Sequence, residues 1–130
     1  MRLLLDTHLA IWVVLNDERL TRKVREMIAG ADGKVWVSTV SVWEIAIKHA
    51  LGRPSDPMPF SAERSIELFH ASGLQLLDIR PEHAAAVEHL PLLHGDPFDR
   101  LLLAQARTEP MHLLSHDAAL IAYGACVTAV

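Results

Sequence analysis

Five acidic residues of this sequence stand where they could form a metal site at the edge of a β-sheet. Each follows a short apolar run that predicts a β-strand, or lies near the predicted start of a helix. They are Asp6, Glu44, Asp96, Asp99 and Asp117. Carboxylates that lie close together repel one another, so at neutral pH they need raised pKa values or a compensating charge. A divalent cation supplies that charge, and all-oxygen ligands favour Mg²⁺ or Mn²⁺ over Zn²⁺.

Asp6 and Glu44 also have structural explanations. Asp6 could form an Asx turn or cap a helix that starts at Leu9, and capping and metal binding explain it equally well. Ser41-Val42-Trp43-Glu44 matches the S-x-x-E capping box, which would place Glu44 in the first turn of a helix. Taken alone, that match favours capping by roughly two to one. For both residues, it is the presence of the other acids that favours a chemical role.

The remaining acids have structural explanations as well. The segment His94–Ala106 reads as a loop that turns into a helix, with Asp96 as N-cap and Pro97 at the first helical position. Asp99 falls in the first turn, where it complements the helix dipole and could also face the same pocket as the first acid. Asp117 could cap a short helix. One shared site explains all five acids more simply than five unrelated structural reasons do.

Three neighbouring polar residues are weaker candidates for substrate binding. Lys48 lies four residues after Glu44, so a helical ion pair is its default role. Arg100 could neutralise a nearby acid or contact a phosphate, and Thr7 could bind a carboxylate or a phosphate, although capping is the preferred role of Thr7. Three histidines lie beside the acids and could support them from behind, although solvated loop residues are the preferred interpretation: His8, His94 and His116. Because no Cys/His ligand spacing occurs, zinc is not expected.

Short apolar runs alternate with amphipathic segments along the chain. The sequence predicts strands at residues 3–5, 35–37, 74–79, 111–114 and 126–130. It predicts helices at residues 9–15, 21–29, 42–51, 61–72, 81–89 and 97–106, and a short alanine-rich helix after Asp117. This alternation indicates an α/β fold with a mostly parallel sheet of about five strands, covered on both faces. Parallel sheets bind ligands at the carboxyl ends of their strands, where the five acids fall.

The composition is that of an ordinary globular domain. The 130 residues are 51% hydrophobic and 22% charged, which predicts one domain spanning residues 1–130. The formal net charge of −4 counts against a non-specific nucleic-acid binder. A single cysteine, no signal-peptide pattern and no membrane-length apolar run lead us to expect a cytoplasmic protein. Trp12, Trp36 and Trp43 lie in apolar segments and are predicted to be core residues.

Three segments carry a more specific pattern. They are Leu3-Leu4-Leu5-Asp6-Thr7-His8, Ser41-Val42-Trp43-Glu44-Ile45-Ala46-Ile47-Lys48 and His94-Gly95-Asp96-Pro97-Phe98-Asp99-Arg100-Leu101-Leu102-Leu103-Ala104-Gln105-Ala106. Together they resemble PIN-domain proteins, in the branch of the VapC-like ribonuclease toxins of bacterial toxin–antitoxin pairs. The resemblance covers nearly the whole chain. It implies a PIN-like (Rossmann-like) three-layer sandwich with an acidic metal site at the edge of its sheet.

The resemblance also implies residue roles. The four acids of the family fall on Asp6, Glu44, Asp99 and Asp117, and Asp96 is an extra acid that could be a further ligand. The last acid of the family usually follows an L-x-T-x-D pattern, and Ser115 stands here in place of the threonine. The family implies Mg²⁺- or Mn²⁺-dependent cleavage of RNA, a small VapB-like antitoxin as partner, and homodimers.

The resulting hypothesis is a metal-dependent endoribonuclease. Asp6 and Asp99 hold the principal metal, while Glu44 and Asp117 complete the site directly or through waters, with one or two cations bound. The metal activates a water for in-line attack on an RNA phosphodiester and stabilises charge on the phosphate and the leaving oxygen.

Two other functions stay open at the level of sequence. The first is a catalytically inactive PIN-like binding module that acts only through a protein partner, although such a scaffold has no reason to keep repelling carboxylates together. The second is a phosphoacceptor receiver domain, which also carries acids at the ends of parallel strands. That domain needs adjacent acids after the first strand and a lysine after the last major one. Here Thr7 and His8 follow Asp6, and no lysine follows Leu114.

Overall fold

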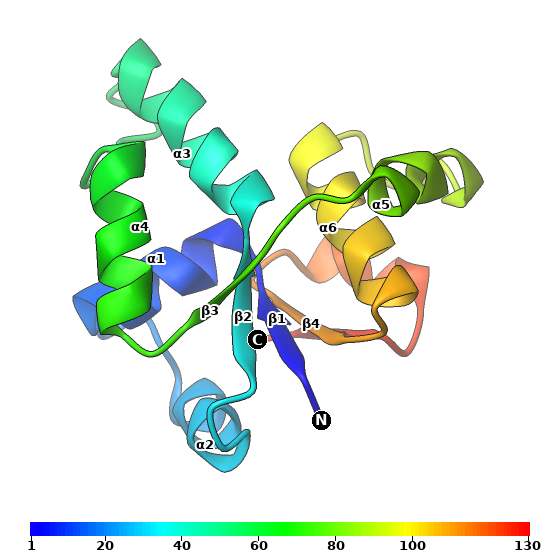
Figure 1. Ribbon diagram of the computed structural model, residues 1–130, viewed down its shortest axis with the longest axis horizontal. Coiled ribbons are helices and arrows are strands. Elements are labelled where there is room, and N and C mark those ends of the chain that lie inside the picture. Colours follow the sequence, from blue (N-terminus) through cyan, green and yellow to red (C-terminus); the bar gives the residue numbers. More distant parts are fainter.

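A computed structural model describes residues 1–130 of the chain. At its centre lies a sheet of five strands in the order β3-β2-β1-β4-β5, and every neighbouring pair is parallel (Figure 1). The strands are β1 (Leu3–Leu5), β2 (Val35–Ser38), β3 (Gln75–Leu77), β4 (His112–Ser115) and β5 (Val127–Ala129). The arrangement confirms the predicted α/β fold, including an edge strand formed by the last part of the chain.

Helices cover both faces of this sheet, which gives the three layers seen in Figure 1. They are α1 (Thr7–Leu15), α2 (Arg22–Gly30), α3 (Thr39–Leu51), α4 (Ala62–Ala71), α5 (Pro81–Ala86) and α6 (Pro97–Thr108), with the 3-10 helices η1 (Val87–His89) and η2 (Ala118–Tyr123). The helix predicted from Leu9 begins at Thr7, because Asp6 is its cap. The helix predicted after Asp117 is a 3-10 helix. No helix combines the length and the apolar character needed to cross a lipid bilayer.

Two apolar clusters, one on each face, hold the layers together. Leu3 and Leu5 belong to the cluster that includes side chains from α1, α2, α3 and α4, and Leu4 belongs to the cluster built largely from α6 and η2. Because β1 lies between β2 and β4 and is covered on both faces, its sequence is continuously apolar. Burial of each leucine contributes about 1.5–3 kcal/mol. This rigid strand ends directly before Asp6 and so fixes the position of that residue.

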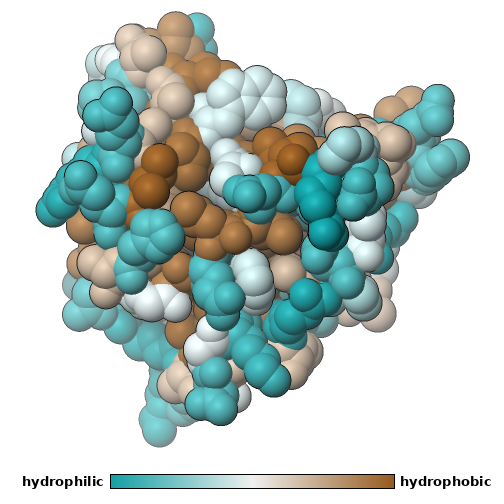
Figure 2. Space-filling view, viewed as in Figure 1, coloured by the Kyte–Doolittle hydropathy of each residue, from teal (hydrophilic) through white to brown (hydrophobic).

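The three tryptophans differ in burial, and the prediction that all are core residues is wrong for Trp43. Trp12 is buried and Trp36 is half-buried, whereas Trp43 is 51% exposed. Trp43 lies on the outer face of α3 with the exposed Ile47 and Leu51, and Figure 2 shows hydrophobic side chains gathered at the outer end of this helix. The Trp43 ring packs edge-on against Phe98, with 5.0 Å between ring centroids.

Candidate active site

A polar cavity of about 360 Å³ opens at the carboxyl edge of the sheet. All nine residues that line it are polar or charged: Asp6, Thr7, His8, Glu44, Lys48, Asp96, Asp99, His116 and Asp117. The fold therefore brings together the five predicted acids from the segment after β1, from α3, from the start of α6 and from the segment after β4. Thr7 and Lys48 lie among them, and the exposed His8 and His116 complete the lining, as expected for solvated residues.

Asp6 both caps α1 and belongs to the cavity. Its Oδ1 accepts the N–H of Leu9 at 2.9 Å, while its Oδ2 accepts the Ser115 hydroxyl at 2.9 Å and the N–H of His116 at 2.8 Å. The side chain is almost completely buried. Burial raises the pKa of Asp6, and the three hydrogen bonds oppose this shift. Capping is thus compatible with a place in the cavity, because Asp6 caps α1 through Oδ1 and also lines the cavity.

Ser115 stands where the family usually has threonine, and its hydroxyl keeps the local structure. Its hydroxyl donates to Asp6 and accepts the N–H of Asp117 at 2.9 Å. Serine supplies the same hydroxyl as threonine, so the segment after β4 is tied to the segment after β1 with either residue.

Glu44 lies deeper in its helix than the sequence predicted. The cap of α3 is Ser38, whose hydroxyl accepts the N–H of Val40 at 3.0 Å, so the helix begins three residues earlier than the capping-box match indicated. Glu44 therefore occupies the second turn, where it is 4% exposed, and its first-turn capping role is wrong. Ser41 is buried inside the helix and caps nothing.

Both oxygens of Glu44 are held by protein groups. The Thr7 hydroxyl donates to Oε1 at 2.6 Å, and the Lys48 ammonium contacts Oε2 at 2.6 Å. The Lys48 contact confirms the predicted helical ion pair. Burial lowers the pKa of Lys48, but the contacts with Glu44 and Asp56 outweigh it and raise that pKa. The preferred capping role of Thr7 is wrong, because Thr7 is buried within the first turn of α1 and binds a carboxylate instead.

Asp96 and Asp99 behave differently although only two residues separate them. Asp96 is the N-cap of α6, as predicted, and its Oδ1 accepts the N–H groups of Phe98 and Asp99 at 2.8 and 3.3 Å. The Asp99 carboxylate accepts no hydrogen bond. Burial, followed by the negative charges of Asp96, Asp6 and Glu44, raises the pKa of Asp99 to about 7, and the nearby His94 opposes part of this shift. Asp99 is therefore the acid with the least compensated charge.

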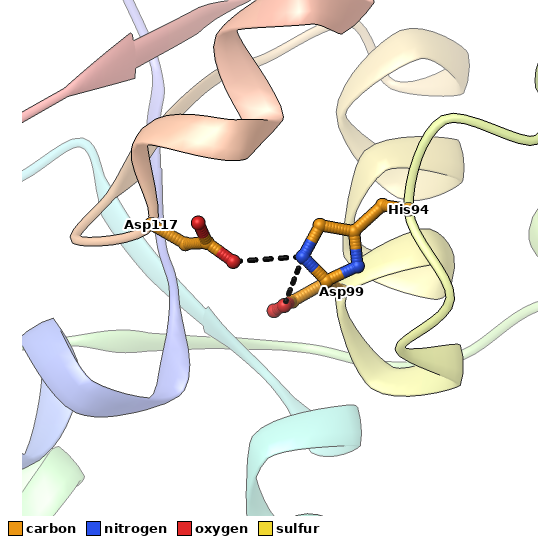
Figure 3. Close-up of side chains that lie close together, drawn as sticks. All are labelled: His94, Asp99 and Asp117. Carbon is orange, nitrogen blue, oxygen red and sulfur yellow. Dashed lines mark hydrogen bonds and ion pairs between the residues drawn. The ribbon is translucent and has the colours of Figure 1, made fainter.

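His94 is the residue of the site for which the sequence reasoning preferred the wrong role. Figure 3 shows the His94 ring facing the carboxylates of Asp117 and Asp99. Its Nε2 lies 2.7 Å from Oδ2 of Asp117 and 3.6 Å from Oδ2 of Asp99. Its side chain is 14% exposed, so the prediction of a solvated residue is wrong. Nδ1 accepts the N–H of Asp96 at 3.0 Å, which leaves the ring proton on Nε2 for donation to Asp117. A histidine two residues before an N-cap can accept the N–H of that cap residue. The spacing of His94 and Asp96 is therefore the sequence signal that could have indicated an ordered His94.

Asp117 has two roles in the structure. It caps η2 by accepting the N–H of Ala119 at 2.9 Å, and it accepts the His94 hydrogen bond, which lowers the pKa of Asp117. One ligand atom from each of His94, Asp99 and Asp117 can be chosen so that all three lie within 4.8 Å of one another. Five carboxylates and one imidazole, without a thiolate, form a donor set that fits a hard divalent cation such as Mg²⁺ or Mn²⁺.

Arg100 does not belong to the cavity. Its guanidinium donates to the carbonyl oxygens of Pro91 and Val87 at 3.0 and 3.3 Å and to the Tyr123 hydroxyl at 3.3 Å. These carbonyl groups hold Arg100 against the segment before α6, so the predicted contact with a nearby acid is wrong, and the contact with a substrate phosphate stays a prediction.

Comparison with known proteins gives one family and several similar folds. The model of the PIN domain family matches residues 3–125. No curated protein sequence matches the chain. A DNA-bound VapBC from Salmonella typhimurium is 15% identical, with 99% of this chain and 98% of that chain covered and a TM-score of 0.69.

Two further solved structures are similar. VapBC2 from Rickettsia felis, bound to a DNA fragment from its promoter, is 12% identical, with 100% of this chain and 98% of that chain covered and a TM-score of 0.68. A toxin–antitoxin complex from Klebsiella pneumoniae is 14% identical, with coverage of 96% and 94% and a TM-score of 0.62. At these identities the likeness is one of fold.

Proposed function

The chain belongs to the PIN domain family, and from this premise we propose that it is a metal-dependent endoribonuclease, the toxin of a VapBC-type toxin–antitoxin pair. It hydrolyses RNA phosphodiesters with Mg²⁺ or Mn²⁺. The observation that carries the proposal is the cavity itself, where five acids from four separate segments meet and Asp99 has no hydrogen-bond donor from the protein. Such an arrangement stores repulsion that a bound cation relieves.

Asp6 and Asp99 would hold the cation, with Asp117, Glu44 and the neighbouring Asp96 completing the site directly or through waters. When bound, the cation supplies a water nucleophile at neutral pH and stabilises the charge that develops on the phosphate. The acids must be ionised for this role, so Asp99 has to release the proton that it retains up to about pH 7 in the metal-free protein.

Other residues of the chain position these acids. The Ser115 hydroxyl and the His116 N–H fix the orientation of the Asp6 carboxylate. The Nε2–H of His94 fixes the orientation of the Asp117 carboxylate, and the same nitrogen lies beside Asp99. Groups held in place before the substrate arrives need little rearrangement during the reaction, which lowers its barrier.

The proposed partner is a VapB-like antitoxin. Two of the similar structures are VapBC assemblies and the third is a toxin–antitoxin complex. By analogy we propose that this chain is inhibited by a small antitoxin, that it forms a homodimer and that it acts in the cytoplasm.

RNA cleavage by the purified chain, free of any partner, tests the activity. We expect cleavage with Mg²⁺ or Mn²⁺, none with EDTA, and none with Asp99→Asn. Asp78→Asn is the matched control, because Asp78 also follows a strand of the sheet but is exposed and lies outside the cavity. The products should carry 5′-phosphate and 3′-hydroxyl ends. Products with 2′,3′-cyclic phosphate ends would contradict hydrolysis by water, because they arise from attack by the 2′-hydroxyl of the RNA.

A folded protein that cuts no RNA would leave the inactive binding module as the alternative. Calorimetry with Mn²⁺ separates the two, since the acidic site of a nuclease with a narrow target still binds the ion.

A further inference from the structure

The ammonium of Lys48 is an internal cation of the cavity. It lies 2.6 Å from Oε2 of Glu44 and 3.0 Å from Oδ2 of Asp56, and its side chain is 23% exposed. Two carboxylates from different segments thus hold it, one inside α3 and one in the loop that follows α3. Because Glu44 is only 4% exposed, withdrawal of Lys48 would leave a buried negative charge without its counter-ion.

The acids of the cavity differ in whether the protein itself supplies a partner. The Glu44 carboxylate binds the Lys48 ammonium and the Thr7 hydroxyl, and the Asp117 carboxylate binds the His94 ring. The other two partnered acids bind backbone and hydroxyl donors: Asp6 and Asp96. Asp99 is the acid left without a hydrogen-bond donor. The uncompensated charge is therefore concentrated at Asp99, next to Asp6, and not at Glu44.

We propose that Lys48 restricts the cavity to a single divalent cation, bound on the side of Asp99 and Asp6, by occupying the position at Glu44 that a second cation would need. Of the two roles that the proposed function leaves open for Glu44, direct ligand or contact through water, this proposal excludes the direct one, because Lys48 occupies the carboxylate. This inference rests on the proposed function, because it concerns the cation that the nuclease would use.

Two physical reasons support this division of the cavity. A divalent cation on Oε2 of Glu44 would share that oxygen with an ammonium group, and two positive charges at such a distance repel strongly in a partly buried site. The other oxygen, Oε1, already accepts the Thr7 hydroxyl at 2.6 Å, and Thr7 itself lies 2.9 Å from the Ser41 hydroxyl. Both oxygens of Glu44 are thus engaged, one of them by a positive charge, whereas the protein groups that donate to Asp6 are neutral.

Lys48 is a positioning residue in this proposal, and the number of bound Mn²⁺ ions is the measurement that tests it. The stoichiometry is determined on the full chain without its partner, by calorimetry and by the electron paramagnetic resonance signal of free Mn²⁺. We expect one Mn²⁺ per chain for the wild type. Lys48→Met should bind two, because Glu44 loses its cation and becomes available. The double variant Lys48→Met with Glu44→Gln should return to one.

Controls separate this effect from a general change of the fold. Lys48→Arg keeps a cation beside Glu44 and should bind one ion. Arg22→Met removes an exposed ion pair of the same i,i+4 type on α2, with Glu26, and should also bind one. Glu44→Gln alone should still bind one ion, because the ligands at Asp99 and Asp6 remain. Circular dichroism shows that each variant is folded before its stoichiometry is compared.

Three results would overturn the inference. They are two equivalent Mn²⁺ ions in the wild type, a folded Lys48→Met variant that still binds one, and complete loss of Mn²⁺ binding in Glu44→Gln. The wild-type and Glu44→Gln measurements keep the test valid if Lys48→Met does not fold. A wild type that binds two ions and cleaves RNA removes the inference but leaves the nuclease proposal intact. A wild type that binds no Mn²⁺ removes both.

Discussion

Asp99 carries the least compensated charge of the cavity, and we predict that Asp99→Asn stabilises the protein when metal is absent. Burial, together with the charges of neighbouring carboxylates, raises the pKa of Asp99 from 3.8 to about 7. Between these two values the folded chain holds a proton that the unfolded chain has released. The free energy of unfolding therefore falls as the pH rises from about 4 to about 7, and above pH 7 the loss is complete. Asparagine carries no charge and avoids this loss.

The magnitude follows from the difference between the two pKa values. A rise from 3.8 to about 7 corresponds to at most about 4 kcal/mol. The Asp99 side chain is 20% exposed, so water in the cavity screens part of this energy. We take about half, roughly 2 kcal/mol, as the gain expected for Asp99→Asn at pH 8. Saturating Mg²⁺ should reverse the order, because a ligand at 100 times its Kd stabilises the wild type by about 2.7 kcal/mol.

Urea unfolding at pH 4 and pH 8 provides the assay, first in EDTA and then in Mg²⁺. We expect the gain at pH 8 in EDTA, little gain at pH 4, and a more stable wild type in Mg²⁺. Asp117→Asn is the control, because its carboxylate is 43% exposed and already bonded to His94, so no gain is expected. If Asp99→Asn is no more stable than the wild type at pH 8 in EDTA, the carboxylate is not an uncompensated charge and the reasoning fails.

Three further predictions follow from contacts in and near the cavity. Ser115→Ala should lower the free energy of unfolding by about 1–3 kcal/mol, because the buried Asp6 carboxylate loses a donor, whereas Ser115→Thr should keep it. Urea unfolding measures both, and equal stabilities would show that the hydroxyl contributes nothing. Mn²⁺ affinity should increase about tenfold between pH 6 and pH 8, since Asp99 must release its proton, and calorimetry that finds no change would contradict its raised pKa. Trp12→Ala should cost about 3–5 kcal/mol and Trp43→Ala less than about 1 kcal/mol, because Trp12 is buried and Trp43 is half exposed. Similar losses for the two variants in thermal or urea unfolding would show that Trp43 is a core residue after all.

Much of the fold could be predicted from the sequence because its signals are local. The run Leu3–Leu5 is continuously apolar, and such a run predicts a strand that is covered on both faces. Asp96 followed by Pro97 predicts the start of α6, and the structure confirms both the cap and the first helical residue. The predicted start of α3 was wrong because Ser38 and Ser41, three residues apart, are equally good N-caps by residue type. Ser38 is the cap because β2 ends at this residue and α3 follows directly. Where a strand ends depends on its pairing with neighbouring strands, which the local sequence does not show.

The candidate site was predicted less completely. Topology alone placed the five acids at one edge of the sheet, because parallel strands present their carboxyl ends together. The role of His94 beside an acid was considered but not preferred, since its main partner is Asp117, 23 residues later in the chain. Arg100 was misplaced for a similar reason: the carbonyl groups that bind it belong to the segment before α6, and no sequence pattern indicates that they turn toward its guanidinium.

By itself, the sequence determined which residue types end the strands and cap the helices, because capping and apolar periodicity involve residues only a few positions apart. Only the tertiary structure decided how the acids differ from one another. Asp99 is left without a donor while Glu44 receives Lys48 and Thr7, and the pKa of Asp99 is raised by burial and by charges from three separate parts of the chain. Electrostatic interactions act through space, so the chemistry of each carboxylate depends on which segments the fold brings beside it.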